Sequence, residues 1–221
     1  MSRSNRMRAK RTRPARHPAE PATMSASRRE RSGRARDRLG PAEFAILGVL
    51  AYRTAADGER GDDGIHGYDL SRHFTEGALA EIIRLESGML YHYLKKLARA
   101  GLIVSHVETQ EGRPDRHLHV LTAGGEAVLS AWLTSPVHAT REIRLDFLLK
   151  LYLSRLIDPA LADSLIAVQH AVMRRLVGSL RSQITAIAAD APDAEFHRAV
   201  LELRLSQTRA TLEWLESLAK R

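Results

Sequence analysis

The segment from Ser87 to Gly101 constrains the fold more than any other, because it predicts one amphipathic helix with both ends defined. Ser87 is expected to cap its N-terminus, with Glu86 beside the positive helix end. Gly101 follows the last turn, where a left-handed residue ends many helices, and Leu102 is expected to fold back on Leu97. The apolar residues recur at the spacing of one helix face: Leu90, Tyr93, Leu94 and Leu97. We therefore predict a helix over residues 87–100 whose apolar face packs against a core.

The opposite face of this helix is polar. Its members are expected to be Tyr91, His92, Lys95, Lys96 and Arg99. Side chains three or four positions apart share a helix surface, so these groups are expected to form one patch. Such a patch is consistent with an ordinary solvated surface and also with a surface that binds nucleic acid. The helix by itself does not distinguish these alternatives.

The neighbouring segments predict a small helical domain with a β-hairpin. A helix is expected from Pro41, and after a Gly- and Asp-rich loop at 54–65 a second is expected over 66–74. In that second helix we expect Tyr68 to pack in the core, with Gly67 permitting close approach. Residues 75–85 are expected to form either a helix or a helix and a short strand.

Strand-like composition follows the 87–100 helix. Residues 102–109 and 116–122 are expected to pair as a hairpin, with Gly112 and Pro114 marking the turn. Thr122 is then expected to cap another helix, which Pro136 closes. Three helices followed by a hairpin form a winged helix-turn-helix, whose wing would span residues 104–120.

The C-terminal third predicts long helices. Residues 141–156 are apolar around nearly the whole helix circumference, so they are expected to have neighbours on all sides. Asp158 and Pro159 begin a second helix, and a last helix follows the break at 190–196. These helices either form a bundle within one chain or pair with a second copy.

The first 40 residues differ sharply in charge from the rest of the chain. Residues 1–40 carry 13 Lys and Arg against 3 Asp and Glu, although the net charge of the whole chain is +8. Almost no large apolar side chains occur there, so we expect a disordered basic tail. The tail either adds salt-sensitive affinity for phosphate or has no role in binding. It also resembles a transit peptide, and Met24 is an alternative start.

Residue content and spacing exclude several kinds of site. The chain has no Cys and no apolar run long enough to span a membrane. The acidic loop misses the spacing of an EF-hand, and the pairs His66/His73 and His117/His119 lack a third ligand at metal spacing. We find no nucleophile–base arrangement and no Gly-rich phosphate loop. We therefore expect a cytoplasmic protein that is not an enzyme and holds no metal or cofactor.

Five segments carry a resemblance to a known family. They are AILGVLA (45–51), HGYDL (66–70), SGMLYHYLKKLARAGLI (87–103), GRPDRHLHVLTAGGE (112–126) and TREIRLDFLLKLYL (140–153). In this order they resemble the PadR family of transcriptional regulators, in the branch with a long helical C-terminal region. The 54–65 loop is longer than the usual turn of that family, which leaves open the geometry between the first two helices.

The resemblance implies a mainly α fold with a winged helix-turn-helix DNA-binding domain over 41–135 and a C-terminal helical dimerisation domain over 136–221. It makes the 87–100 helix the recognition helix and implies that Tyr91 contacts DNA. We expect the wing to contact the DNA backbone or minor groove. The candidate DNA contacts are Ser87, Tyr91, His92, Lys95, Lys96, Arg113 and Arg116.

The resemblance also implies a homodimer on double-stranded DNA and a small-molecule effector. Trp132 and Trp214 are the candidate ligand contacts, although core packing is the simpler explanation of each. We expect a ligand-responsive dimeric repressor that reads a pseudo-palindromic operator. Two alternatives stay open: a winged-helix adaptor for protein–protein binding, and an RNA-binding protein that depends on the basic tail.

Overall fold

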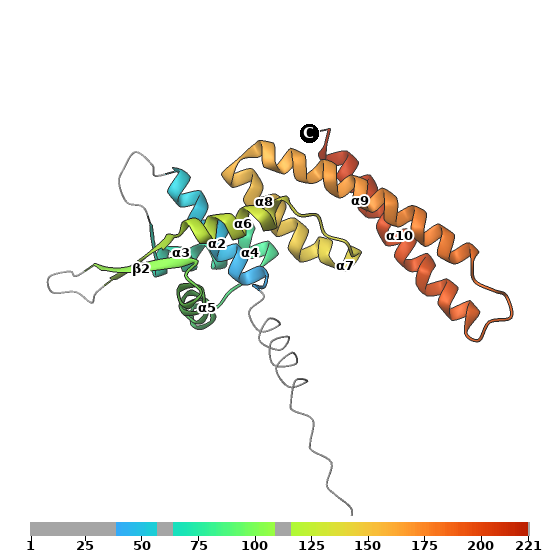
Figure 1. Ribbon diagram of the computed structural model, residues 1–221, viewed down its shortest axis with the longest axis horizontal. Coiled ribbons are helices and arrows are strands. Elements are labelled where there is room, and N and C mark those ends of the chain that lie inside the picture. Colours follow the sequence, from blue (N-terminus) through green and yellow to red (C-terminus); the bar gives the residue numbers. More distant parts are fainter. Residues whose placement is uncertain (1–38, 57–63, 109–115, 221) are drawn as a thin grey trace, which may run out of the picture. The chain divides into compact units, whose positions relative to one another are not determined.

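The computed structural model describes residues 39–56, 64–108 and 116–220, and these form a winged helix-turn-helix followed by long helices (Figure 1). The expected basic tail therefore lies outside the described residues, apart from Leu39 and Gly40. The winged part contains α2 (Pro41–Ala56), β1 (Ile65–His66), α3 (Gly67–Thr75), α4 (Ala78–Ile82), α5 (Ser87–Arg99), β2 (Ile103–Glu108), β3 (Arg116–Leu121) and α6 (Ala123–Thr134). The rest contains α7 (Thr140–Glu142), the π-helix η1 (Ile143–Phe147), α8 (Leu148–Ile157), α9 (Pro159–Thr185) and α10 (Ala194–Leu218).

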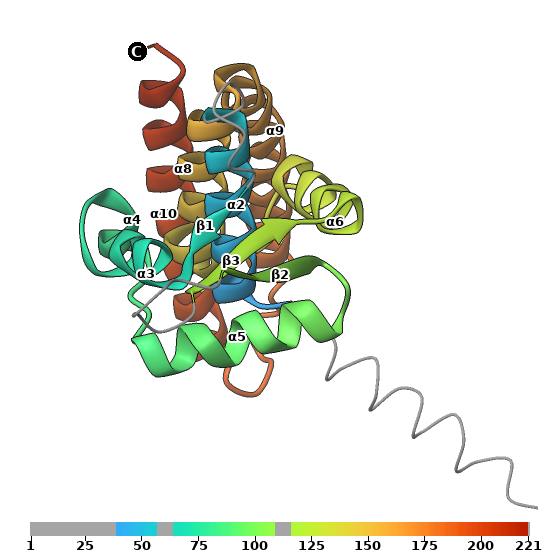
Figure 2. The same ribbon diagram turned by 90° about the vertical axis from the view of Figure 1, so that its left-hand side faces the viewer.

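The sheet has one strand more than the sequence predicts. Its order is β1-β3-β2, and both pairings are antiparallel (Figure 2). Strands β2 and β3 are the predicted hairpin, with Ile103 opposite Leu121 and Glu108 opposite Arg116. Strand β1 was predicted as the end of a loop and the start of a helix, because two residues are too few to show the alternation that marks a strand. Residues 83–86 form no strand, so the segment 75–85 contributes the short helix α4 alone.

The core of the winged part forms around α2. Residues 45–47 and 49–50 of this helix are buried, which confirms the expectation of a helix covered on several sides. Leu90, Leu94 and Leu97 of α5 belong to the same cluster, so the predicted apolar face of α5 does pack on a core. Two residues from the C-terminal part, Leu149 and Leu153 of α8, complete this cluster.

Helices α8, α9 and α10 enclose a second core. Phe147, Leu151, Leu165, Met173 and Leu215 are buried together there. Farther along, α9 and α10 lie side by side and bury a third, smaller cluster between them (Figure 1). The apolar character of residues 141–156 is thus explained, because opposite sides of α8 face different cores.

The predicted helix caps of the later helices are confirmed. Thr122 accepts a hydrogen bond from the backbone N–H of Gly125 at 3.0 Å, and it donates to the carbonyl of Gly101 at 2.8 Å. Asp158 accepts from the N–H of Ala160 at 2.9 Å. These contacts satisfy polar groups that the first turns of α6 and α9 would otherwise leave unpaired.

Polar side chains, of which Gln169 and Lys150 are buried, hold the linker between α6 and α7. The Gln169 amide accepts from the N–H of Val137 at 2.8 Å and donates to the Val137 carbonyl at 2.9 Å. Lys150 donates to the carbonyl and the hydroxyl of Ser135 at 2.6 Å and 2.9 Å. Glu142 accepts from the N–H groups of His138 and Ala139, each at 3.0 Å. The winged part is therefore joined to the later helices through a linker whose backbone is fixed at successive residues.

Replacing Gln169 by Leu tests this linker. Gln169 and Val137 are both buried, so Gln169→Leu leaves one buried N–H and one buried carbonyl without partners. The variant is expected to lose about 3 kcal/mol in the free energy of unfolding. Urea denaturation at one protein concentration measures this loss. Gln183→Leu is the matched control on the same helix, and as an exposed substitution it should change stability by less than about 0.5 kcal/mol. Equal effects of the two substitutions would contradict the role of Gln169.

Candidate nucleic-acid interface

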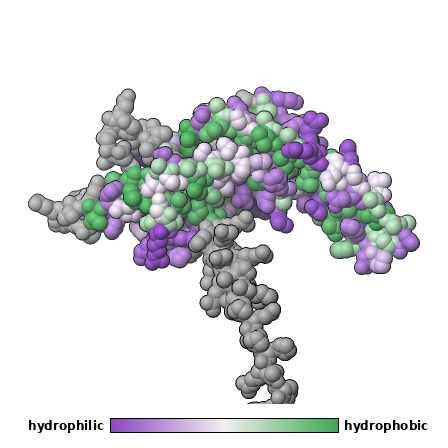
Figure 3. All heavy atoms as spheres, in the orientation of Figure 1, coloured by the Kyte–Doolittle hydropathy of each residue, from purple (hydrophilic) through white to green (hydrophobic). Residues whose placement is uncertain are grey.

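The exposed face of α5 is mainly polar, with Met89 as its exposed apolar side chain in the first turn. Tyr91, His92, Lys95 and Arg99 are exposed, whereas Leu90, Leu94 and Leu97 on the opposite side are buried. Figure 3 shows hydrophilic atoms gathered over this helix. The predicted division of the helix into a packed face and a polar face is therefore confirmed for these residues.

The C-terminal end of α5 has the predicted glycine stop. Gly101 has a φ of 71°, in the left-handed region that favours glycine. The N–H of Leu102 donates to the carbonyl of Leu97, and the N–H of Gly101 donates to that of Ala98, each at 3.0 Å. Leu102 packs against the same core as Leu97. This pattern of two bonds and an apolar contact ends the helix and directs the chain into β2.

The predicted cap at the other end of α5 is wrong. Ser87 is the first helical residue, and Glu86 occupies the cap position without a side-chain cap bond. The Ser87 hydroxyl instead lies 3.3 Å from the hydroxyl of Ser71 in α3. Ser87 is exposed, so its hydroxyl sits on the surface where α3 and α5 meet.

Lys96 also lies differently from the prediction. It does not join the exposed face of α5, because its ammonium pairs with the carboxylate of Glu43 in α2. Glu43 is buried, and its second oxygen accepts the N–H of Gly40 at 2.6 Å. An amphipathic pattern cannot reveal this contact, because Glu43 lies 53 positions away in the sequence. Lys96 therefore fixes α5 against α2.

The wing contributes exposed basic and polar side chains next to α5. Arg116 and His117 are exposed at the start of β3. Arg113 and Pro114, predicted at the wing tip, lie outside the described residues. The described part of the hairpin thus supplies one predicted DNA contact, Arg116.

A pocket of about 450 Å³ lies between the start of α3, the first turns of α5 and the base of the wing. It brings together Tyr91 and Arg116, which were predicted as DNA contacts, with residues that were not.

The prediction that Tyr68 packs in the core is wrong, because its side chain is 75% exposed. Gly67 does permit a close approach, but the approaching ring is Tyr91: a Cβ on Gly67 would lie 3.1 Å from the Tyr91 hydroxyl oxygen. The lining residues are His66, Gly67, Tyr68, Asp69, Tyr91, Arg116, His117 and His119.

His119 at this pocket is almost completely buried, with 6% of its surface exposed. Its Nδ1 lies 2.8 Å from the hydroxyl of Ser105, and its Nε2 has no hydrogen-bond partner among the residues that the structure describes. Burial lowers the pKa of His119, and the nearby imidazoles of His117 and His66 lower it further. The only sequence signal for this arrangement is the alternation that places His117 and His119 on one face of β3, since His66 joins them only through β1.

The two candidate ligand-binding tryptophans are half-buried and pack against the cores. Trp132 stacks on Phe44, with ring centroids 4.3 Å apart, and the Lys150 ammonium lies 4.8 Å from the Trp132 ring centroid. Burial lowers the pKa of Lys150 to about 8. Trp214 meets the edge of Phe147 at 5.9 Å. Both rings therefore fill cores near the junction of the winged part with the later helices, and their role as ligand contacts is an untested prediction.

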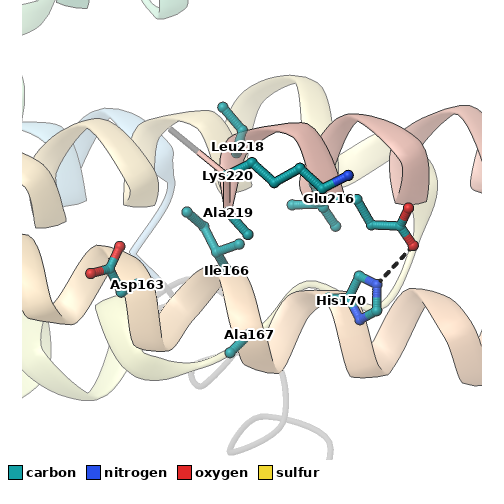
Figure 4. Close-up of a pocket in the computed structure, with 9 residues that line it drawn as sticks. Asp163, Ile166, Ala167, His170, Glu216, Leu218, Ala219 and Lys220 are labelled. Carbon is teal, nitrogen blue, oxygen red and sulfur yellow. Dashed lines mark hydrogen bonds and ion pairs between the residues drawn. The ribbon is translucent and has the colours of Figure 1, made fainter.

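A second pocket, of about 680 Å³, lies between the start of α9 and the end of α10 (Figure 4). Its walls include Ile166 and Leu215, and Nε2 of His170 lies 3.2 Å from the carboxylate of Glu216 at one side. Neither tryptophan lines it.

Two further searches cover the described ranges 39–56, 64–108 and 116–220. Within them, no group of three His, Asp or Glu side chains is arranged to hold a metal ion. None of the helices described there combines the length and the apolar character needed to span a membrane.

Comparisons with known proteins connect both parts of the chain to regulators. Residues 61–131 match the model of the transcriptional regulator PadR-like family, and residues 143–221 match the model of the virulence activator alpha C-terminal region. No match is found among curated proteins.

Three solved structures are among those similar to this chain. Bacillus subtilis PadR in complex with operator DNA is 25% identical over 80% of this chain and 96% of that chain, with a TM-score of 0.38. The protein smu.1604c from Streptococcus mutans UA159 is 23% identical over 81% of this chain and 98% of that chain, with a TM-score of 0.36. Bacillus subtilis PadR in complex with p-coumaric acid is 23% identical over 82% and 98%, with a TM-score of 0.35.

All three TM-scores lie below 0.5, so the family assignment rests on the two sequence matches. The first match contains α3, α5 and the hairpin, and the second contains α8, α9 and α10. Residues 61–131 are therefore a PadR-like transcriptional regulator domain, and residues 143–221 are a virulence activator alpha C-terminal region.

Proposed function

We propose that the protein is a sequence-specific DNA-binding regulator that inserts α5 into the major groove and places its wing on the adjacent backbone. The observation that carries this proposal is the exposed polar face of α5, beside a wing base with exposed Arg116 and His117. A helix enters the major groove only when its outer face is polar and uncrowded. The exposed side chains of α5 meet this requirement: Tyr91, His92, Lys95 and Arg99. They lie in the region that matches the PadR-like family of transcriptional regulators.

The proposed contact set differs in one respect from the sequence-based set. Lys96 is replaced as a DNA contact by Arg99, because the Lys96 ammonium is already paired with the buried Glu43. We propose for Lys96 a supporting role, in which it fixes the angle of α5 on α2. Ser87, Tyr91, His92, Lys95 and Arg116 remain candidates, and Arg113 remains a prediction outside the described residues.

The protein is proposed to act as a homodimeric repressor on a pseudo-palindromic operator. An exposed apolar stripe on α10 supports the dimer: Phe196, Val200 and Leu203 are separated by four and three positions, and Phe196 is 73% exposed. Hydrophobic atoms are visible on this end of the α9–α10 pair in Figure 3. A second copy that covers the stripe would repeat α5 by two-fold symmetry, as an operator with two half-sites requires.

Control by a small aromatic acid is the last part of the proposal. The linker between the winged part and the later helices is held by Lys150, whose ammonium also lies on the Trp132 ring. A carboxylate that attracted Lys150 away from Ser135 would loosen this linker and change how α5 is presented. Such a ligand shifts the population of DNA-competent dimers only if it binds the protein with the held linker and the protein with the loosened linker with different affinity.

Lys95→Ala tests DNA binding. The exposed ammonium is proposed to contact a guanine or a phosphate, so its loss should weaken binding to DNA from upstream of the gene by roughly tenfold. Fluorescence anisotropy with a labelled duplex measures the affinity. Lys220→Ala, at an exposed lysine on the far side of the chain from α5, is the matched control and should bind normally. A reporter driven by the same DNA should become more active in the Lys95 variant if the protein represses.

The same assay separates the alternatives. Specific binding should survive deletion of residues 1–40, whereas an RNA-binding protein that depends on the basic tail would lose its binding. Absence of binding to any duplex would favour the protein–protein adaptor. Equal affinity of the Lys95 and Lys220 variants would contradict the assignment of α5.

Phe196→Glu/Leu203→Glu tests the dimer. Two charges on the exposed stripe should prevent a second copy from covering it, because burying an unpaired carboxylate is strongly unfavourable. Sedimentation velocity should show a monomer. The helix content of the variant should be unchanged, and its operator affinity should fall by about tenfold or more. Val128→Glu, at an exposed apolar residue of α6, is the control and should remain a dimer. A dimeric double variant would show that the interface lies elsewhere.

Tryptophan fluorescence tests the effector proposal. In Trp214→Phe the emission reports on Trp132 alone, next to Lys150. A small aromatic acid such as p-coumaric acid should quench this emission saturably and release the operator duplex. Both responses should be lost in Lys150→Met. If a panel of aromatic acids leaves the emission and the DNA complex unchanged, the proposed ligand class is wrong.

A further inference from the structure

A buried histidine, His119, lines the pocket between α3, α5 and the base of the wing. His119 is 6% exposed and lines the pocket, and its Nε2 has no hydrogen-bond partner in the described part of the chain. Ser105 already occupies the other ring nitrogen at 2.8 Å. A buried polar atom left unpaired costs roughly 1–3 kcal/mol, so this ring nitrogen is an unusual feature of the pocket wall.

Exposed hydrogen-bond donors surround the same pocket. Tyr91, Arg116 and His117 are exposed lining residues from α5 and β3. Gly67 leaves the room that the Tyr91 ring needs, because a Cβ there would lie 3.1 Å from both the Tyr91 hydroxyl oxygen and a ring carbon. Phenol, guanidinium and imidazole groups that converge on one pocket are suited to an oxyanion.

The charges that face His119 come from three elements. His66 lies in β1, and His117 lies two positions before His119 on β3. Asp69 of α3 and Arg116 of β3 also line the pocket. Asp69 is the one carboxylate among the lining residues, and it is exposed at the surface of α3. The lining therefore carries one positive charge on Arg116 and one negative charge on Asp69, which offset each other. Any net charge of the lining comes from its three imidazoles.

We propose that this pocket is a phosphate seat whose histidines, His117 above all, bind a backbone phosphate of duplex DNA beside the recognition helix. The seat rests on the proposed DNA-binding function and adds to it a phosphate contact made by the wing base together with Tyr91 of α5. His119 acts as a positioning residue beneath His117. The volume of about 450 Å³ leaves space for the sugar atoms that flank the phosphate.

The proposal predicts that DNA binding is coupled to proton uptake. In the free protein, burial and the neighbouring imidazoles lower the pKa of His119, so this ring is neutral at neutral pH. A phosphate bound beside an imidazole favours the protonated form of that imidazole. Because the complex then holds more protons than the free protein, DNA affinity rises as pH falls from about 8 to about 6.

The experiment measures affinity for the upstream duplex across this pH range in the full chain. The wild-type affinity is expected to rise at least tenfold more than that of His117→Asn between pH 8 and pH 6. His106→Asn is the matched control, since His106 is exposed on β2 and does not line the pocket. Gly67→Ala displaces the Tyr91 ring without removing a polar group, so it should weaken binding even if a histidine variant folds poorly. Duplexes with single uncharged methylphosphonate linkages should identify one phosphate whose neutralisation removes the difference between wild type and His117→Asn.

Two outcomes would overturn the phosphate seat. If wild type binds the duplex and His117→Asn and Gly67→Ala bind with the same pH profile, DNA binding stands and the seat is wrong. If wild type binds no duplex, the proposed function fails, and the seat is judged by titration with inorganic phosphate. The imidazole proton resonances that are absent from His117→Asn must then shift with phosphate in wild type, and unchanged resonances would reject the seat.

Discussion

Helix α8 is buried on two sides, and the arrangement of the rest of the chain depends on this. Leu149 and Leu153 of α8 belong to the core of the winged part, whereas Leu151 of α8 and Phe147 at the end of η1 belong to the core formed with α9 and α10. The approach to α2 is so close that a Cβ on Gly48 would lie 2.4 Å from a methyl carbon of Leu153. Since protein cores are densely packed, a shift of α8 has to be accommodated in both clusters at once. The π-helix η1 leads directly into α8, which sets the side that each apolar residue faces.

The junction between the winged part and the later helices contains directional hydrogen bonds in addition to its apolar contacts. Gln169, Lys150 and Glu142 each bind backbone groups of the linker that joins α6 to α7. Lys150 is the most unusual of these, because a buried ammonium is stabilised by Ser135 and by the Trp132 ring while burial lowers its pKa to about 8. A charge in such surroundings is sensitive to any new anion nearby. The junction therefore offers a physical route by which events at the later helices would reach the winged part.

The orientation of α5 depends on a second buried charge. Glu43 of α2 receives the N–H of Gly40 and the ammonium of Lys96, so the α2–α5 contact includes an ion pair beside the apolar cluster. Removing Lys96 would be costly because the buried carboxylate of Glu43 would be left uncompensated. The pair thus favours one position of α5, and the polar face of α5 is presented from a defined scaffold. At the other end of this face, Tyr91 meets Gly67 and connects the helix to the pocket at the wing base.

Features carried by local pattern were predictable from the sequence. The apolar face of α5, the Gly101 stop, the caps at Thr122 and Asp158 and the β2–β3 hairpin follow from helix and strand periodicity and from short-range hydrogen bonding. The resemblance of these segments to PadR regulators was also visible in the sequence, and the family matches confirm it. For the same reason, the exposed positions of Tyr91, His92 and Lys95 could be read from helix geometry alone.

What required the tertiary structure are contacts between residues far apart in the chain. Strand β1 exists because β3 pairs with it, and Lys96 turns inward because its ammonium pairs with the buried Glu43. Tyr68 is exposed, and the ring that approaches Gly67 is that of Tyr91. The pocket joins His66 to His117 and His119, which are 51 and 53 positions away along the chain. The sequence by itself therefore determined which helices and strands form and which faces they bury, since these depend on neighbouring residues. Only the tertiary structure decided which polar groups meet, because that depends on how the buried faces pack.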